Sequence, residues 1–212
     1  METKLQLLSL TILFYTQSAH AADFCVADLA SRETSTGYPC KSPSNVTVDD
    51  FVFKGFTAPL STSNPNKLSL NRAFVKSFPA LNGLDLAAVR VDMERDGVVP
   101  LHSHPYSPEM IFIIEGTVTA GFVSGLDSNV AYIKTLNKGE MMVIPQGFLH
   151  FQANSGPGNA TIFVNFNKAD PGVQFITGAL FRNSFPTWLL EKTTGISQAE
   201  IRDLKNLHGG SG

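Results

Sequence analysis

Short apolar runs separated by turn-forming residues fill the chain from residue 49 to residue 167. The runs are rich in β-branched and aromatic residues, with Gly, Pro and Asn between them, and cover residues 50–53, 89–93, 110–114, 117–123, 130–136, 141–144 and 161–166. In residues 89–93 the polar Arg90 and Asp92 alternate with apolar neighbours, which is the pattern of a strand with one buried face. Such runs favour strands over helices. Their spacing predicts a β-barrel or a β-sandwich.

The C-terminal part of the chain has a different pattern. A short helix is predicted to open at Pro186 and to end at Gly195, and Ser197 with Glu200 forms a capping box before a second helix. Apolar residues at positions 201, 204 and 207 give this second helix one apolar face. Both helices are therefore expected to pack against another surface.

The N-terminus has the features of a secretory signal peptide over residues 1–21. Lys4 supplies the positive start, residues 5–16 form an apolar stretch, and Ala19-His20-Ala21 is a cleavage site of the A-x-A type. The alternative is a transmembrane helix, but the apolar stretch falls short of the ~20 residues that span a bilayer. We therefore expect a secreted protein.

Secretion changes the interpretation of the two cysteines and of two asparagines. Cys25 and Cys40 are the only cysteines, and an oxidising compartment favours a disulfide between them, worth about 3 kcal/mol for a loop of this size. Two free thiols are the alternative. Asn45 and Asn159 begin glycosylation sequons, although the second sequon runs into a predicted strand.

Composition limits the number of domains and the partners. With 212 residues, 43% hydrophobic and 16% charged, the chain can bury one well-formed core. The net charge of −2 and the isoelectric point near 6.2 give no basic surface for nucleic acid or an anionic membrane. Small molecules or other protein surfaces are the expected partners.

Three histidines lie outside the signal and the C-terminal tail, and they fall within two short stretches. His102 and His104 would point to the same face of a strand. Glu109 follows a Pro-rich turn, and His150 follows the turn formed by Pro145-x-Gly147. Three imidazoles and one carboxylate suit a divalent first-row metal, and the absence of a thiolate argues against copper(I) or an iron–sulfur cluster. Ordinary hydrogen-bonded core histidines are the alternative.

Three further features are given structural roles. Asn154 is interpreted as a turn former rather than a metal ligand. Lys138-Gly139-Glu140 is interpreted as a turn between strands. Phenylalanines near the two histidine stretches are predicted to line the barrel and to keep a metal cavity dry and narrow, at positions Phe112, Phe122, Phe148, Phe151 and Phe163.

The two stretches resemble the conserved boxes of the cupins. They read His102-x-His104-x4-Glu109-x6-Gly116 and Gly139-x5-Pro145-x-Gly147-x2-His150-x3-Asn154. The signal, the cysteine pair and the helical tail are most similar to plant germin-like proteins. Within the germins, residues 145–152 and 178–183 most resemble the auxin-binding-protein-like subgroup. The resemblance implies an all-β fold, a single cupin jelly-roll β-barrel with C-terminal helices. It divides the chain into a signal peptide (1–21), a disulfide-closed arm (22–48), a barrel (49–170) and a helical oligomerisation segment (171–208).

The resemblance also implies a cofactor, an assembly and a location. Mn²⁺ would be held by His102, His104, Glu109 and His150. The chain would form a homo-hexamer, a trimer of dimers joined through the C-terminal helices. It would lie in the extracellular space, apoplast or cell wall.

Departures from the family pattern bear on the activity. Asp96 replaces the first glycine of the usual Gly-Gly, and Tyr106-Ser107-Pro108 replaces small residues, so both are expected to reshape the mouth of the pocket. Oxalate-oxidising germins carry an asparagine just before the Arg-Val-Asp segment, where this chain has Val89. The first hypothesis is therefore a manganese superoxide dismutase that releases hydrogen peroxide, not an oxalate oxidase. A non-catalytic binder of auxin or another small acid, and a cell-wall receptor or scaffold, are the alternatives.

Overall fold

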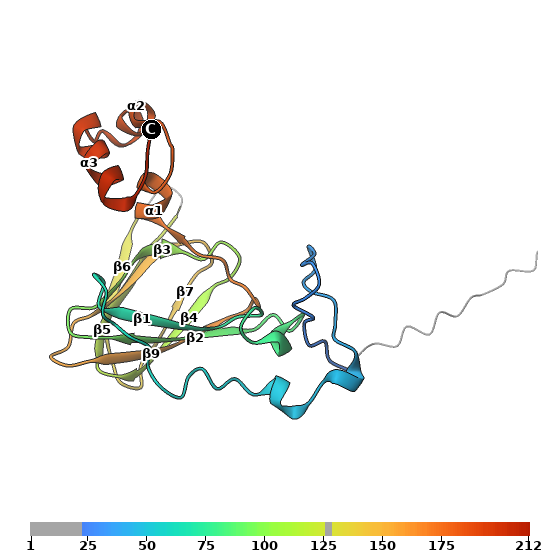
Figure 1. Ribbon diagram of the computed structural model, residues 1–212. Coiled ribbons are helices and arrows are strands. Elements are labelled where there is room, and N and C mark those ends of the chain that lie inside the picture. The colour runs from blue at the N-terminus through green and yellow to red at the C-terminus, as the bar shows by residue number, and fades with distance from the viewer. Residues whose placement is uncertain (1–22, 126–128) are drawn as a thin grey trace, which may run out of the picture.

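Two five-stranded antiparallel sheets face each other and form a jelly-roll barrel (Figure 1). The computed structural model describes residues 23–125 and 129–212, so the predicted signal peptide over residues 1–21 lies outside the described residues. The first sheet has the order β1 (Leu68–Ala73), β2 (Ala87–Met93), β9 (Ala160–Phe166), β4 (Glu109–Glu115) and β7 (Met141–Ile144). The second has the order β10 (Gln174–Phe175), β3 (Val98–Ser103), β8 (Leu149–Asn154), β5 (Thr117–Val123) and β6 (Ala131–Asn137). The predicted fold class is confirmed.

The core lies between the sheets, and strand alternation decides which side chains reach it. On β4, Ile111 and Ile113 are fully buried, while Phe112 between them is on the outer face. Phe163 likewise alternates with buried neighbours on β9 and packs against Phe56 outside the barrel, with ring centroids 5.7 Å apart. Of the five phenylalanines predicted to line the barrel, only Phe122 packs against the core, which is filled mainly by Val and Ile. The prediction therefore holds for Phe122 and was wrong for the other four, of which Phe112, Phe151 and Phe163 alternate with buried neighbours on their strands.

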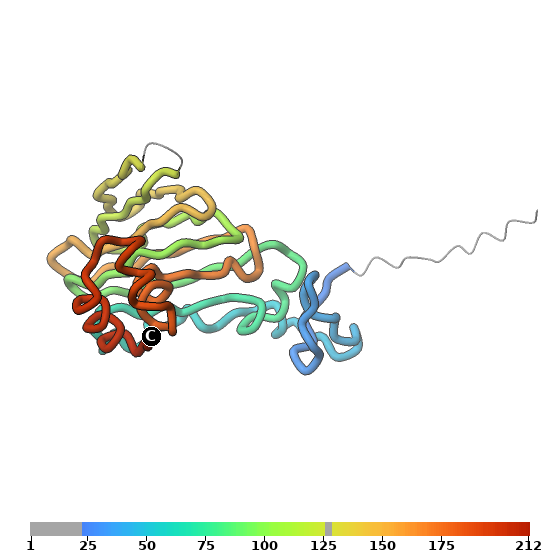
Figure 2. The backbone as a smooth tube through the Cα atoms, turned by 90° about the horizontal axis from the view of Figure 1, so that it is seen from above, coloured from blue at the N-terminus to red at the C-terminus, as the bar shows by residue number. Residues whose placement is uncertain are grey.

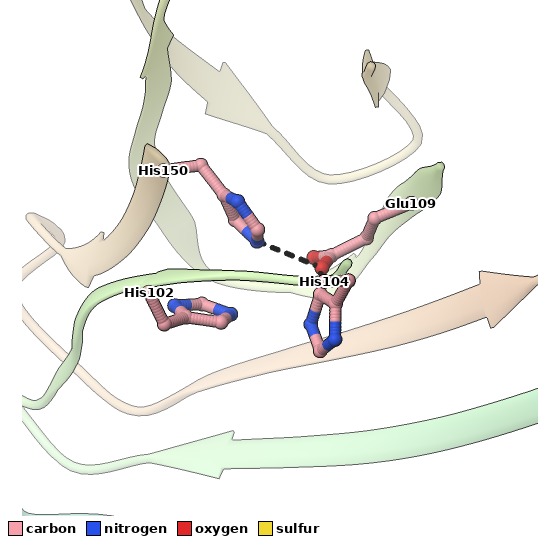
Figure 3. Close-up of side chains that lie close together, drawn as sticks. All are labelled: His102, His104, Glu109 and His150. Atoms are coloured by element: carbon pink, nitrogen blue, oxygen red, sulfur yellow. Dashed lines mark hydrogen bonds and ion pairs between the residues drawn. The ribbon is translucent and has the colours of Figure 1, made fainter. Parts of the chain in front are cut away.

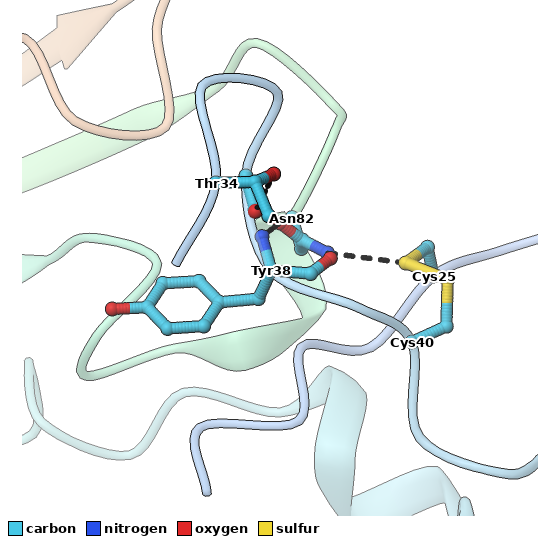
Figure 4. The surroundings of a disulfide bond; sticks show 6 residues. Cys25, Thr34, Tyr38, Cys40 and Asn82 are labelled. Atoms are coloured by element: carbon cyan, nitrogen blue, oxygen red, sulfur yellow. Dashed lines mark hydrogen bonds between the residues drawn. A yellow bond between two sulfur atoms is a disulfide. The ribbon is translucent and has the colours of Figure 1, made fainter. Parts of the chain in front are cut away.

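An N-terminal arm docks beside the barrel, and the predicted disulfide between Cys25 and Cys40 is present in it (Figure 4). The buried Asn82, next to the 3₁₀ helix η3 (Pro79–Leu81), donates from Nδ2 to the Tyr38 carbonyl at 2.7 Å and to the Cys25 sulfur at 3.1 Å. It accepts the Tyr38 N–H at 3.1 Å. One side chain thus ties the disulfide loop to the body.

The strand predicted at residues 50–53 is wrong. The 3₁₀ helix η2 (Val48–Phe51) overlaps this stretch, and it follows a first 3₁₀ helix, η1 (Pro43–Asn45). The Asp50 carboxylate accepts the Thr47 backbone N–H at 2.8 Å, and this local bond favours a helical turn over an extended strand. The sequon asparagines Asn45 and Asn159 are both exposed, and their glycosylation stays a prediction.

Three helices follow the barrel: α1 (Ile176–Phe181), α2 (Thr187–Thr194) and α3 (Gln198–His208). They gather at one end of the molecule, away from the N-terminal arm (Figures 1 and 2). Gly195 ends α2 with a φ of 74°, and the Ser197 capping box opens α3, as the sequence predicts. The helices pack on one another through Phe181, Leu190 and Ile201. None of the helices in the described residues combines the length and apolar content that crossing a bilayer requires.

Candidate metal centre

The two histidine stretches meet inside one end of the barrel. His102 on β3 pairs with His150 on β8, His104 follows the end of β3, and Glu109 opens β4. The β3–β8 register shifts between Val99 and His102, so the strand is irregular where it enters the site. One nitrogen or oxygen atom from each of the four side chains lies within 4.8 Å of all the others (Figure 3). All four residues are buried.

Each imidazole is oriented by a backbone carbonyl. His102 Nδ1 lies 2.8 Å from the Pro100 carbonyl oxygen, and His150 Nδ1 lies 2.8 Å from that of Phe148. His104 Nδ1 bonds the Gly172 carbonyl just before β10. Because a carbonyl oxygen only accepts, Nδ1 carries the proton in each ring, and a neutral ring presents an Nε2 lone pair. This carbonyl support is typical of metal-ligating histidines.

Glu109 faces these nitrogens. Its Oε2 lies 3.1 Å from His104 Nε2 and 3.0 Å from His150 Nε2, and its Oε1 accepts the Gln152 amide N–H at 2.9 Å. Contacts of this kind between buried groups are favourable only with a positive charge among them, supplied by protons on the rings or by a metal ion. The residues therefore fit a metal ion.

The pKa values agree with this. Burial would raise the pKa of Glu109, but its contacts with His104 and His150 outweigh burial and lower the pKa to about 2. Burial, followed by the nearby His150, lowers the pKa of His102 to about 4. Near neutral pH the carboxylate is charged and His102 is neutral, which are the protonation states that bind a metal.

A small cavity of about 40 Å³ adjoins the centre. Its wall is mostly apolar, and Val89, predicted from the sequence to border the site, is part of it. The polar residues that line it are His102, His104 and Glu109 of the cluster, together with Arg72 and Gln152. A water needs roughly 10–15 Å³ of such volume, so the cavity admits a few water-sized groups rather than a bulky ligand.

Other residues singled out in the sequence fall elsewhere. Asp96 adopts a φ of 64° in the turn between β2 and β3, at the opposite end of the barrel, so the expectation that it shapes the pocket mouth is wrong. Tyr106 is 64% exposed and lies against Gly172 beside the centre. Asn154 is outside the metal cluster, and its Nδ2 donates to the Glu94 and Gly158 carbonyls at 2.9 and 2.8 Å.

The sequence did not predict Gln152 and Arg72 as residues of the site. Gln152 lies two residues after His150, so strand alternation alone would have placed it on the same inner face. Arg72 carries no such signal, because its nearness to the centre depends on how β1 pairs with β2.

Comparison with known proteins agrees with this architecture. A cupin family model matches residues 54–202. The chain is 45% identical over 203 residues to germin-like protein subfamily 3 member 1 of Arabidopsis thaliana, covering 96% of this chain and 97% of that protein. It is 44% identical over 200 residues to auxin-binding protein ABP20 of Prunus persica, covering 94% and 92%. A solved recombinant oxalate oxidase in complex with glycolate has a TM-score of 0.85 and 33% identity, over 89% of this chain and 96% of that one.

A jelly-roll barrel that buries three imidazoles and one carboxylate beside a small cavity defines a cupin with a metal-binding site. The chain belongs to the cupin family and, within it, to the germin-like proteins.

Proposed function

We propose that this chain is a secreted, manganese-binding germin-like protein that dismutates superoxide. The main support is the buried cluster of His102, His104, Glu109 and His150, which lies beside a cavity with room for only a few water-sized groups. Four protein ligands leave two positions open on a metal that prefers six, as a catalytic site requires. Bound manganese would supply one-electron redox chemistry, converting two superoxide ions and two protons into dioxygen and hydrogen peroxide.

The protein's part in this reaction is to hold the ligands and to limit access. Backbone carbonyls fix the three rings, and the Gln152 amide fixes Glu109 through its second oxygen, so little reorganisation accompanies binding. The Glu109 carboxylate offsets part of the cation's charge and favours the more oxidised ion. The small cavity with its apolar wall excludes solutes larger than a few water-sized groups.

Oxalate is a poorer candidate substrate, although the similar solved structures include an oxalate oxidase. Oxalate needs polar groups beyond the metal to hold its far carboxylate. Val89, 6% exposed, lines the cavity where oxalate-oxidising germins place an asparagine, and Val99, 3% exposed, also lines it. Methyl groups there forgo a charge-assisted hydrogen bond worth about 1.5–3 kcal/mol. We therefore propose that oxalate is not turned over.

The test is metal analysis of the purified protein followed by superoxide and oxalate assays. We expect about one manganese per chain, dismutation by the wild type, none by His150→Ala, and no peroxide from oxalate. Dismutation that survives the loss of His150, or robust oxalate turnover, would contradict the proposal.

Capture of an auxin-like or other apolar acid without turnover is the second candidate. A relative named as an auxin-binding protein and the apolar wall of the cavity favour it. The cavity volume of about 40 Å³ weighs against it, because the body of such an acid would have to lie outside. Calorimetry with indole-3-acetate on metal-loaded protein separates the two, since saturable binding without superoxide turnover selects the acid binder.

Assembly and location belong to the same proposal. Trp188 on α2 is 55% exposed and Leu207 on α3 is 77% exposed, so the helices leave apolar surface available for the proposed hexamer. The disulfide suits the proposed extracellular or cell-wall location. Sedimentation of the purified protein tests the hexamer. A hexamer without metal-dependent activity would favour the scaffold or receptor alternative.

A further inference from the structure

Arg72 occupies a position where the barrel would be expected to bury an apolar residue. Leu70 and Phe74, two residues away on either side, line the cavity of the metal centre, and Arg72 lines it with them. The register pairs Arg72 with Val89, and two residues earlier on β2 Ala87 pairs with Phe166, which in turn pairs with Glu109. Arg72 is therefore at the metal end of the barrel.

Arg72 is an exposed residue, and its guanidinium has no hydrogen bond or ion pair within residues 23–125 and 129–212. Arg90 on the next strand shows the contrast, because its guanidinium binds both carboxylate oxygens of Asp92 at 2.8 Å and the Phe56 carbonyl at 2.8 Å. Among the described residues that line the cavity, Arg72 alone carries a permanent positive charge. The cavity's negative charge, Glu109, is buried and already in contact with His104, His150 and Gln152.

A structural role would also explain a charge at this place. β1 lies at the edge of its sheet, and a charged residue on an edge strand discourages pairing with another chain. A positive or a negative charge would serve this edge role equally well. Attraction of an anion needs a positive charge, which gives the two roles different consequences.

We propose that Arg72 draws small anions to the metal centre and holds them at its mouth, which makes it a specificity-determining residue. A free cation beside low-dielectric walls concentrates anions, and the small cavity restricts them to a few atoms. The ligand class is then a compact monoanion. The inference rests on the proposed metal site and on its preference for a small anionic substrate.

The experiment measures azide binding to manganese-loaded protein, by calorimetry and by the change in the metal's spectrum, at low ionic strength. The variants are Arg72→Lys, Arg72→Gln and Arg72→Glu. Lys138→Gln is the matched control, because it also removes one positive charge but lies in the turn between β6 and β7 at the opposite end of the barrel. Metal content and circular dichroism establish that each variant is folded and loaded.

Azide should bind about 5- to 10-fold more weakly to Arg72→Gln, and weaker still, by roughly the square of that factor, to Arg72→Glu. Arg72→Lys and Lys138→Gln should stay within about twofold of the wild type. Raising the salt from about 0.01 M to about 0.5 M should weaken binding to the wild type more than to Arg72→Gln.

If Arg72→Glu binds azide as tightly as the wild type, the inference is wrong, and Arg72 serves only to discourage pairing at the sheet edge. The inference is also wrong if the manganese-loaded wild type does not bind azide. If Arg72→Glu does not fold, the comparison of Arg72→Lys with Arg72→Gln decides alone. Arg72-dependent azide binding in a protein that does not dismutate superoxide would reject the proposed function and keep this inference. Superoxide dismutation together with azide binding that does not depend on Arg72 would keep the proposed function and reject this inference.

Discussion

The two ends of the barrel interior are built on the same strands but satisfy their polar groups differently. On β8 the inward-facing residues are His150, Gln152 and Asn154, from the metal end to the far end. At the far end, the Asn154 amide is matched by backbone carbonyls and accepts the Gly156 N–H at 3.1 Å. At the metal end, Nε2 of His104 and of His150 lies 3.1 and 3.0 Å from Glu109 Oε2, so these groups need a proton or a metal ion between them.

This difference separates a structural polar residue from a functional one. A buried amide whose donors and acceptors are matched stabilises the fold and needs nothing more. A buried group of acceptors directed at one point is costly unless a cation joins them. Burial and strand position alone do not make this distinction, because His150 and Asn154 are 1% and 4% exposed on the same face.

The largest expected effect removes the converging acceptors. In Glu109→Ala, we expect metal affinity to fall by more than about 100-fold, since even partners beyond the ligands are worth 10–100-fold. Metal analysis after dialysis measures this. Asn154→Ala, the matched change at the far end, should lower stability but leave the metal content of folded protein unchanged. Stoichiometric metal in Glu109→Ala would show that Glu109 is not a ligand.

The second effect concerns the apolar core away from the metal end. Ile113 is fully buried and pairs with Ile162, four residues along β4 from Glu109. Ile113→Ala should lower the free energy of unfolding by about 2–5 kcal/mol, because it leaves a cavity in a packed core. Denaturant unfolding of metal-free protein measures this. A loss of metal from protein that is still folded would mean that the two ends are not independent.

The sequence predicts the inner and outer faces of the barrel better than it predicts contacts across it. The strands at residues 89–93 and 161–166 follow from alternation, and the four clustered residues follow from motif spacing. Alternation indicates the inner position of Gln152, but not its contact with Glu109, which is 43 residues away in the sequence. Strand β1 was missed because Arg72 interrupts its inward-facing apolar row. The strand predicted at residues 50–53 did not form, because the hydrogen bond from the Thr47 N–H to Asp50 favours a helical turn there.

The third effect is a pH dependence confined to the metal end. In metal-free protein, the pKa of His102 is lowered to about 4 from 6.5, so between these pH values the unfolded chain binds more protons than the folded chain. Stability should therefore be lost as pH falls from about 6.5 to about 4, by about 1–3 kcal/mol. The pKa of Glu109, lowered to about 2 from 4.5, adds a further loss as pH falls from about 4.5 towards 2.

Unfolding of metal-stripped protein between pH 4 and pH 8 measures the first loss. His102→Asn should flatten the curve between about pH 4 and pH 6.5. Ile113→Ala should shift the whole curve without changing its shape, because no titratable group lies in the apolar cluster around Ile113. An unchanged curve in His102→Asn would assign the acid sensitivity to other groups.

The smallest expected effect adds a polar group to the wall of the metal end. Val89 is 6% exposed, lines the cavity and pairs with Val164 on β9. An asparagine there would offer an amide N–H to a carboxylate beyond the metal, a bond worth about 1.5–3 kcal/mol to a charged partner. Part of this gain is offset, because the same amide is buried and unmatched when no ligand is present. We therefore expect Val89→Asn to strengthen oxalate binding by only about 3- to 10-fold.

Calorimetry of oxalate on manganese-loaded wild type and Val89→Asn measures the change, with Val89→Leu as the control for altered packing. Equal oxalate affinity in the wild type and Val89→Asn would show that the wall at Val89 does not set the choice of anion.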